Sequence, residues 1–166
     1  MRNLACAGAF ESLRILQKKE VVMTFIAPKT LHSLSPEIIR DALRPKLLKY
    51  EGKLFEEQGK CPECESNRAR KNYINNRKVF ARIITENNTT HTIRIRLRWF
   101  TCSDCGKVFC AKNNPCKRGY QYSSLIVNFV LYYADHPFHH LEKIMMDFGL
   151  QVDRDTIGRW IRDFGK

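Results

Sequence analysis

Apolar residues recur at helical spacing through the last quarter of the chain. Within residues 123–166, three short stretches place apolar side chains three or four positions apart, which is typical of amphipathic helices. Ser123 and Asp153 precede the first and third stretches as candidate N-caps, and Pro137 opens the second. Gly149 follows the second stretch, where helices often end. The pattern predicts three packed helices.

The first part of the chain is also predicted to be helical. Ser35 and Pro36 are typical of a helix start, and apolar residues follow at helical spacing. Because proline removes a backbone N–H and clashes with the preceding turn, Pro45 predicts a break or kink that leaves two short helices. We interpret residues 1–60 as a helical lead-in. Its first 22 residues are either disordered or untranslated, since the start codon can be Met1 or Met23.

Between these helical parts, the pattern changes to the alternation of β-strands. Residues 78–85 and 92–100 are predicted strands on either side of a polar turn at residues 87–90. Side chains alternate along a strand, so the second strand turns Ile93, Ile95, Leu97 and Trp99 one way and Arg94, Arg96 and Arg98 the other. Like charges side by side destabilise a sheet, so bound phosphate groups would explain this row of arginines. The alternative is a solvated face that protects an edge strand.

Positive charge is concentrated in this β-rich part. The formal net charge of the 166 residues is +12, and residues 61–122 hold thirteen Lys and Arg against four Asp and Glu. Such an excess favours a polyanionic partner, above all nucleic acid. No stretch approaches the ~20 apolar residues of a membrane span, and no secretory signal is evident. We expect a cytoplasmic protein with reduced thiols that binds no membrane.

Two C-x-x-C pairs in the same part predict a metal site. Cys61 and Cys64 form the first pair, Cys102 and Cys105 form the second, and 37 residues that include both strands lie between them. Four thiolates from two tight turns complete the tetrahedron that Zn²⁺ prefers and leave no open position. Gly106 follows the second pair, where a tight turn favours positive φ. We expect one structural zinc ion.

The remaining cysteines leave alternatives open. Cys110 and Cys116 follow the second pair and are alternative ligands, a second weak site or ordinary core residues. Together the patterns predict an α+β fold. It has a small β zinc ribbon over residues 61–122, a helical lead-in, and three C-terminal helices over residues 123–166 that form a helix-turn-helix.

The third C-terminal helix has the composition of a recognition helix. Its apolar stripe of Ile157, Trp160, Ile161 and Phe164 faces the core, and polar residues occupy its start and outer face. In a helix-turn-helix, such residues reach base edges and phosphates in the major groove. The candidate DNA contacts are Arg154, Thr156, Arg159 and Arg162 on this helix, together with Arg94, Arg96 and Arg98 on the strand. A plain three-helix bundle is the alternative.

Three segments resemble the N-terminal region of prokaryotic and archaeal insertion-sequence transposases. They are RLRWFTCSDCGKVF from Arg96, GYQYS from Gly119 and VDRDTIGRW from Val152. The resemblance implies a zinc ribbon and a helix-turn-helix that bind the terminal inverted repeats of a transposon. In that family a catalytic DDE domain follows, whereas this chain ends at Lys166. The resemblance therefore implies DNA recognition without strand transfer, in a truncated or split transposase or in a regulator derived from one.

Two further functions compete with this hypothesis. The same modules suit a transcription regulator that binds an operator, and they also suit a zinc-ribbon module that docks onto another protein. Expected partners are double-stranded DNA and either a second copy of the chain or a separate catalytic transposase subunit. An enzyme is the weakest reading, because the sequence has no paired acidic metal site, nucleophile constellation or phosphate-binding glycine loop.

Overall fold

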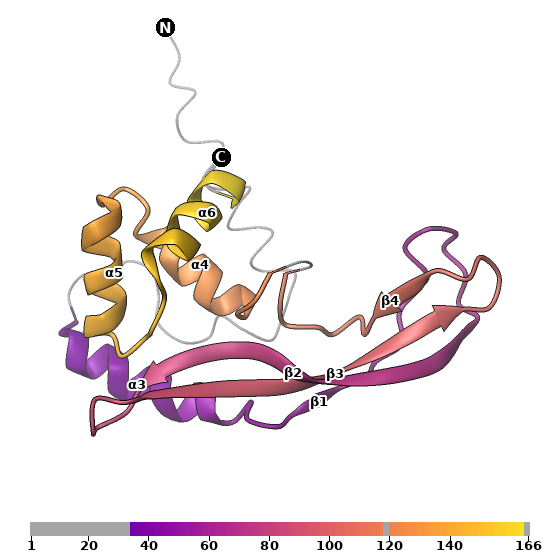
Figure 1. The fold of residues 1–166 in the computed structure, drawn as a ribbon, viewed down its shortest axis with the longest axis horizontal. Coiled ribbons are helices and arrows are strands. Elements are labelled where there is room, and N and C mark those ends of the chain that lie inside the picture. Colours follow the sequence, from indigo (N-terminus) through magenta and orange to yellow (C-terminus); the bar gives the residue numbers. More distant parts are fainter. Residues whose placement is uncertain (1–33, 118–119, 165–166) are drawn as a thin grey trace, which may run out of the picture. The chain divides into compact units, whose positions relative to one another are not determined.

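The computed structural model describes residues 34–117 and 120–164, of which all but residues 34 and 35 belong to the compact unit Pro36–Lys166. The expectations for residues 1–33, including the choice between Met1 and Met23, lie outside the described residues. The described part is α+β. Its elements, drawn in Figure 1, are α3 (Pro36–Leu48), β1 (Leu54–Phe55), β2 (Ala69–Ile84), β3 (Thr90–Cys102), β4 (Val108–Cys110), α4 (Ser124–Tyr132), α5 (Phe138–Asp147) and α6 (Arg154–Phe164).

A long antiparallel hairpin of β2 and β3 forms the centre of the four-stranded mixed sheet. Both strands are longer than the predicted ones, and the loop between them has Asn88 at positive φ. The other edge of β3 pairs first with β1, in parallel, and then with β4, antiparallel. Neither β1 nor β4 was predicted. Bulges interrupt the β2–β3 register at three places along the hairpin.

The two halves of β3 bury opposite faces. In the first half Ile93, Ile95 and Leu97 are buried, as the alternation predicts, while Arg94 and Arg96 are exposed. In the second half Phe100 and Cys102 are buried instead. In this half β4 pairs with β3, and Phe100 stacks on its register partner Phe109 at 5.9 Å between ring centroids. The hairpin therefore has two small cores, one at each end.

The expected break at Pro45 was wrong. Helix α3 begins at Pro36, as predicted, but continues through Pro45 to Leu48. Its apolar stripe continues past the proline and buries Leu47 almost completely. Residues 49–60 form no second helix, because β1 docks beside β3 at this point.

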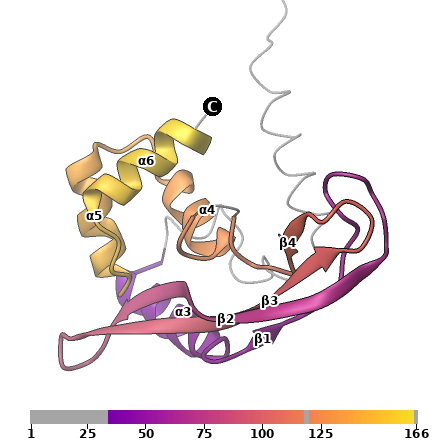
Figure 2. The ribbon, with the colours of Figure 1, turned by 45° about the vertical axis from the view of Figure 1, so that its right-hand side comes forward.

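The C-terminal helices cover the loop end of the hairpin, and β4 lies toward the opposite end (Figure 2). Their attachment uses the free edge of β2. Ser123 N donates to Phe80 O at 2.7 Å, and Gln151 N donates to Arg82 O at 2.9 Å. In return, Ile84 N donates to Gly149 O at 2.8 Å. The helices are thus bonded to the hairpin of the cysteine-bearing sheet.

Local signals at the ends of these helices agree with the sequence. The Ser123 hydroxyl accepts from Ile126 N and caps α4, α5 follows Pro137, and Gly149 has φ +73° just after α5. At the start of α6, Thr156 N donates to Asp153 Oδ1 at 2.8 Å. The α6 core is centred on Trp160, which is fully buried.

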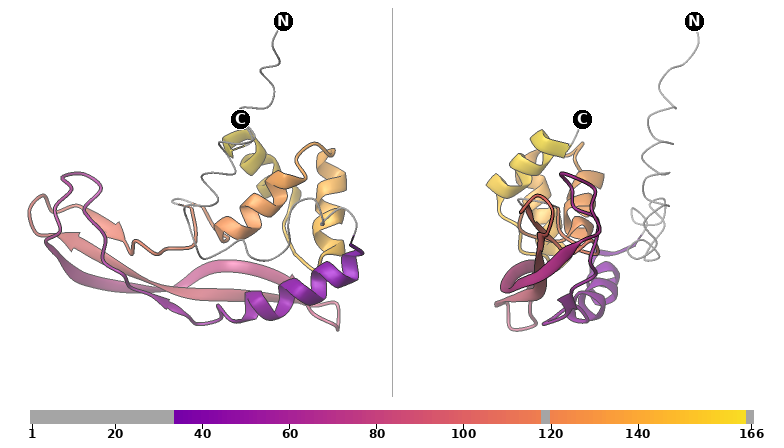
Figure 3. Two further views of the ribbon diagram at one scale, coloured as in Figure 1. Left: turned by 180° about the vertical axis from the view of Figure 1, so that it is seen from behind. Right: turned by 90° about the vertical axis from the view of Figure 1, so that its right-hand side faces the viewer.

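Helices α3 and α6 lie on opposite sides of the helical end, as the two views in Figure 3 agree. One face of α6 therefore remains open on the side away from α3. Among the helices over residues 36–48 and 124–164, none is long and apolar enough to cross a lipid bilayer.

Candidate metal centre and nucleic-acid interface

The four predicted cysteines converge at the end of the hairpin opposite the helices. All four sulfurs lie within 4.8 Å of one another. Cys61 Sγ is 3.5 Å from Cys105 Sγ, and Cys64 Sγ is 3.6 Å from Cys102 Sγ. A tetrahedral ion with Zn–S bonds of about 2.3 Å separates its sulfurs by roughly 3.8 Å. The spacing therefore fits one metal ion, and four soft thiolates favour zinc.

Two similar turns hold these cysteines. In the first, Cys61 N donates to Ser66 O at 2.9 Å, and in the second Cys102 N donates to Lys107 O at 2.8 Å. Each turn needs one residue at positive φ directly after its second cysteine. Gly106 takes this role with φ +72°, as predicted, but Glu65 takes it in the first turn with φ +58°. A non-glycine residue rarely adopts this conformation.

Backbone amides and neighbouring thiols shift the pKa values of the clustered cysteines in opposite directions. The N–H groups of Cys105 and Asp104 lower the pKa of Cys102 to about 7. The Ser66 N–H acts in the same direction on Cys64, but hydrogen bonding to Cys105, burial and the other thiols raise its pKa to about 12. A divalent metal among the four sulfurs would stabilise their thiolate forms and displace the protons.

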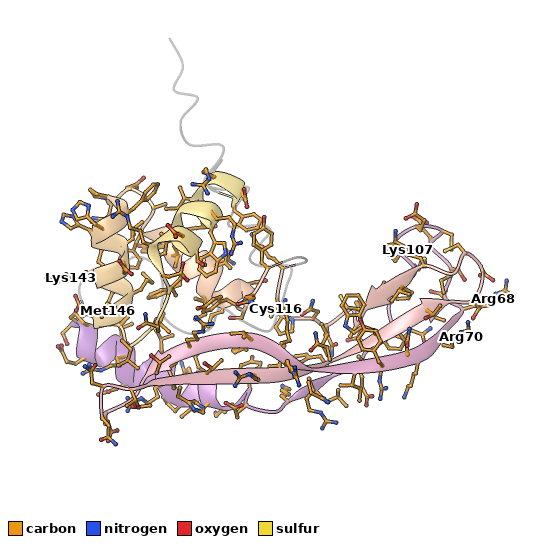
Figure 4. The ribbon with its side chains drawn as sticks, in the orientation of Figure 1. Arg68, Arg70, Lys107, Cys116, Lys143 and Met146 are labelled. Atoms are coloured by element: carbon orange, nitrogen blue, oxygen red, sulfur yellow. The ribbon has the colours of Figure 1, made fainter. Side chains whose placement is uncertain are left out.

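Ion pairs bridge the two turns on the outside of the cluster. Arg68 contacts Asp104, and Lys107 Nζ lies 3.3 Å from Glu63 Oε2. Hydrogen bonds from Ser66 and Arg68 lower the pKa of Asp104. Arg68, Arg70 and Lys107 gather at this end of the molecule in Figure 4. Of these three, only Arg70 pairs with no carboxylate in the described part of the chain.

Cys110 and Cys116 are not part of the cluster, which contains only the four predicted cysteines among the described residues. The Cys110 sulfur accepts from Asn114 Nδ2 at 3.5 Å. Burial raises the pKa of Cys116 to about 11, so its thiol is neutral at physiological pH. Of the readings left open for Cys116, its surroundings are those of a core residue.

The three strand arginines have different surroundings. Arg94 and Arg96 are exposed, and Arg96 Nε donates to Asn76 Oδ1 at 3.3 Å. Arg98 differs, since its side chain is only 18% exposed. Its guanidinium lies 3.6 Å from Glu56 and donates to the Asn72 carbonyl at 3.1 Å. The alternation pattern does not reveal these two partners of Arg98, because both belong to distant parts of the sequence.

The four predicted residues of α6 also divide into two kinds. Arg154, Arg159 and Arg162 are exposed. Thr156 is partly buried, and its hydroxyl donates to Asp153 Oδ2 at 2.9 Å, which makes it part of the helix cap. Burial alone would raise the pKa of Asp153, but the hydrogen bonds from Thr156 outweigh it and lower that pKa.

Beside α6 lies a polar and aromatic cluster that the sequence reading missed. Tyr120 donates its hydroxyl proton to Asp163 Oδ2 at 2.6 Å, which raises the pKa of the phenol. The Arg159 guanidinium lies 5.8 Å from the centroid of the Tyr120 ring, and Lys117 Nζ lies 3.6 Å from that of Phe164. The only sequence signal was the excess of aromatic and basic residues between the second cysteine pair and α4.

Comparison with known proteins adds no family to this picture. The chain matches no family model, and neither curated proteins nor solved structures give a significant match.

Proposed function

We propose that this chain is a zinc-stabilised DNA-binding module that places α6 in the major groove of a specific duplex. The observation that supports the proposal most directly is the division of α6 into two faces. Ile157 and Trp160 are fully buried on one face, while Arg159 and Arg162 are exposed on the other. No carboxylate of the described residues pairs with either arginine. Such an outward arginine face suits base edges and phosphates.

The roles within α6 follow from exposure. Arg159 and Arg162 are the candidates for base contacts, and Arg154 in the first turn is the candidate for a phosphate contact. Thr156 would position the helix through the Asp153 cap. The connection between α5 and α6 spans residues 148–153, longer than the usual turn of a helix-turn-helix. We attribute the extra length to its bonds with β2, which fix where α6 points.

The strand arginines would add contacts with the DNA backbone. Arg94 and Arg96 are exposed on the same face of β3, and their guanidinium groups pair with no carboxylate among the residues described. We assign phosphate contact to these two. Arg98 would contribute less, because Glu56 and the Asn72 carbonyl already hold its guanidinium.

The resemblance to transposases supports terminal repeats of a mobile element as the target, and an operator duplex is the alternative target. The metal centre would serve the fold alone, because four cysteine ligands leave no open position for a substrate.

Selection from a random duplex library, followed by binding titration, tests the proposal. We expect the wild-type protein to enrich one sequence and Arg159→Ala with Arg162→Ala to weaken binding to it by about tenfold or more. Lys143→Ala with Lys49→Ala is the charge-matched control, since both lysines are exposed and lie outside α6. It removes two positive charges away from α6 and should change the affinity little. Wild-type affinity should also fall steeply with salt.

Two outcomes would contradict the proposal. One is a selection that enriches no sequence, so that the protein binds the selected duplexes no more tightly than random DNA. The other is an equal loss of affinity in the double-lysine control and the α6 variant, which would indicate only general electrostatic attraction. Enrichment of a duplex found at mobile-element ends, and not next to promoters, would favour the transposase origin.

A further inference from the structure

An aromatic pair with an exposed tyrosine lies on the cysteine-bearing half of the hairpin. Tyr73 of β2 and Trp99 of β3 stack with ring centroids 5.8 Å apart and an interplanar angle of 17°. Tyr73 is 55% exposed, although tyrosine in a sheet usually packs against neighbours. Trp99 is only partly exposed and its indole Nε1 is buried, so Tyr73 presents the flat aromatic surface to solvent and Trp99 supports it from below.

A bulge in β2 creates this presentation. The register shifts between Lys71 and Ile74, so that Asn72 and Tyr73 together oppose Trp99. The Asn72 side chain holds the bulge, since its Oδ1 accepts from Tyr73 N at 2.9 Å and its Nδ2 donates to Thr101 Oγ1 at 2.9 Å. Bulges commonly redirect a side chain next to a functional site. Here the bulge turns Tyr73 outward.

Positive charge flanks the aromatic pair on the same face. Thr101 is two residues from Trp99, so both lie on one face of β3, and Arg70 is the register partner of Thr101. Arg70 is exposed and extends from the hairpin end in Figure 4. Residues 66–85 contain no Asp or Glu but several Arg and Lys. Exposed Arg70, Lys71 and Arg77 pair with no carboxylate among the described residues.

From this arrangement we infer that the Tyr73–Trp99 face is a second nucleic-acid site, which binds unpaired bases of a single strand. A base can stack on an aromatic ring only when it has left its own duplex stack. Arg70, on the same face, supplies the charge that a phosphodiester backbone needs, whereas Lys71, opposite Phe100, lies on the other face. Asparagine amides nearby, at Asn72 and Asn75, offer both donors and acceptors to base edges. An acidic peptide would use the charge but not the flat aromatic surface.

This site is independent of the α6 interface. It lies on the half of the hairpin that bears the cysteines, whereas the helices cover the other half (Figures 1 and 2). The inference holds even where α6 binds no duplex, so the two proposals can fail separately.

Titration of the zinc-loaded full chain with short single-stranded oligonucleotides tests the inference. Oligothymidine and an abasic strand of the same length carry the same charge and differ only in their bases. We expect oligothymidine to bind at least about tenfold more tightly than the abasic strand and to quench tryptophan fluorescence. A uridine strand of the same length shows whether DNA or RNA is preferred.

Variants at Tyr73 provide the second part of the test. Tyr73→Ala should reduce the affinity for oligothymidine to that for the abasic strand, whereas Tyr73→Phe keeps the ring and should bind as the wild type does. Neither should change duplex binding or zinc content. Arg159→Ala with Arg162→Ala should show the reverse pattern. Equal binding of oligothymidine and the abasic strand, or unchanged binding in folded Tyr73→Ala, would overturn the inference.

Discussion

At the scale of single residues, the two cysteine turns differ at the position after the second cysteine. Gly106 and Glu65 adopt the same backbone conformation there, although only glycine does so without strain.

The two turns provide a matched test of backbone strain. Gly106→Ala places a side chain at φ +72°, and although the new Cβ would meet no atom within 4 Å, the conformation itself disfavours it. We expect a loss of about 1 kcal/mol in the free energy of unfolding. Glu65→Ala is the control, because that position already carries a Cβ at positive φ; its effect should be within about 0.5 kcal/mol. Denaturant unfolding of the zinc-loaded proteins measures both, and equal losses would contradict the strain argument.

At the scale of elements, the predictions were correct for helix ends that are set by neighbouring residues. They failed where tertiary packing determines whether an element forms. Ser123, Pro137 and Asp153 marked the helix starts correctly because capping involves only neighbouring residues. Pro45 misled, because the burial of Ile39, Leu43 and Leu47 along one stripe outweighs the roughly 3 kcal/mol that an interior proline costs. Strands β1 and β4 are two and three residues long, and they exist only because β3 offers a free edge.

Two glycines at the C-terminal helices should respond to alanine in opposite directions. Gly158 lies inside α6, where a Cβ would meet only the tip of Arg162 at 3.6 Å. Gly158→Ala should therefore stabilise the protein by about 0.5–1 kcal/mol, through the higher helix propensity of alanine.

Gly149 is the opposite case. It has φ +73°, and a Cβ would lie 2.8 Å from Arg40 Cγ on α3. Gly149→Ala should destabilise by more than about 1 kcal/mol, because strain and the displacement of Arg40 add together. Thermal unfolding of both variants measures the signs. A stabilising Gly149→Ala, or a destabilising Gly158→Ala, would show that the local geometry of that glycine is misjudged.

At the scale of the whole unit, backbone hydrogen bonds join the C-terminal helices to the cysteine-bearing hairpin. Strand β2 is part of the cysteine-bearing hairpin. Along its outer edge, the backbone groups of Phe80, Arg82 and Ile84 also form hydrogen bonds with the segments that flank the C-terminal helices. Such pairing is invisible in sequence because its partners are about forty to seventy residues apart. The consequence is a hairpin with one core at the cysteines and another beneath the helices. The two cores should depend on metal to different degrees.

Removal of the metal should affect the stability of the two cores differently. At the cysteine end the buried apolar side chains are few, chiefly Phe100 and Phe109, and small cores of this kind often require a metal. At the helical end Trp160, Leu141 and Met145 are fully buried and contact no cysteine of the cluster. Chelation of zinc should therefore unfold the first end and leave the second largely intact.

Each end carries one tryptophan, which makes this expectation measurable. In Trp160→Phe the remaining Trp99 reports on the cysteine end, and its emission should shift to the red when a chelator removes zinc. In Trp99→Phe the remaining Trp160, fully buried, should keep its emission. Cys102→Ser should reproduce the effect of chelation, whereas Cys110→Ser should not, since Cys110 lies outside the cluster. If both tryptophans responded together, the ends would be one cooperative unit, and α6 would then be positioned only while zinc is bound.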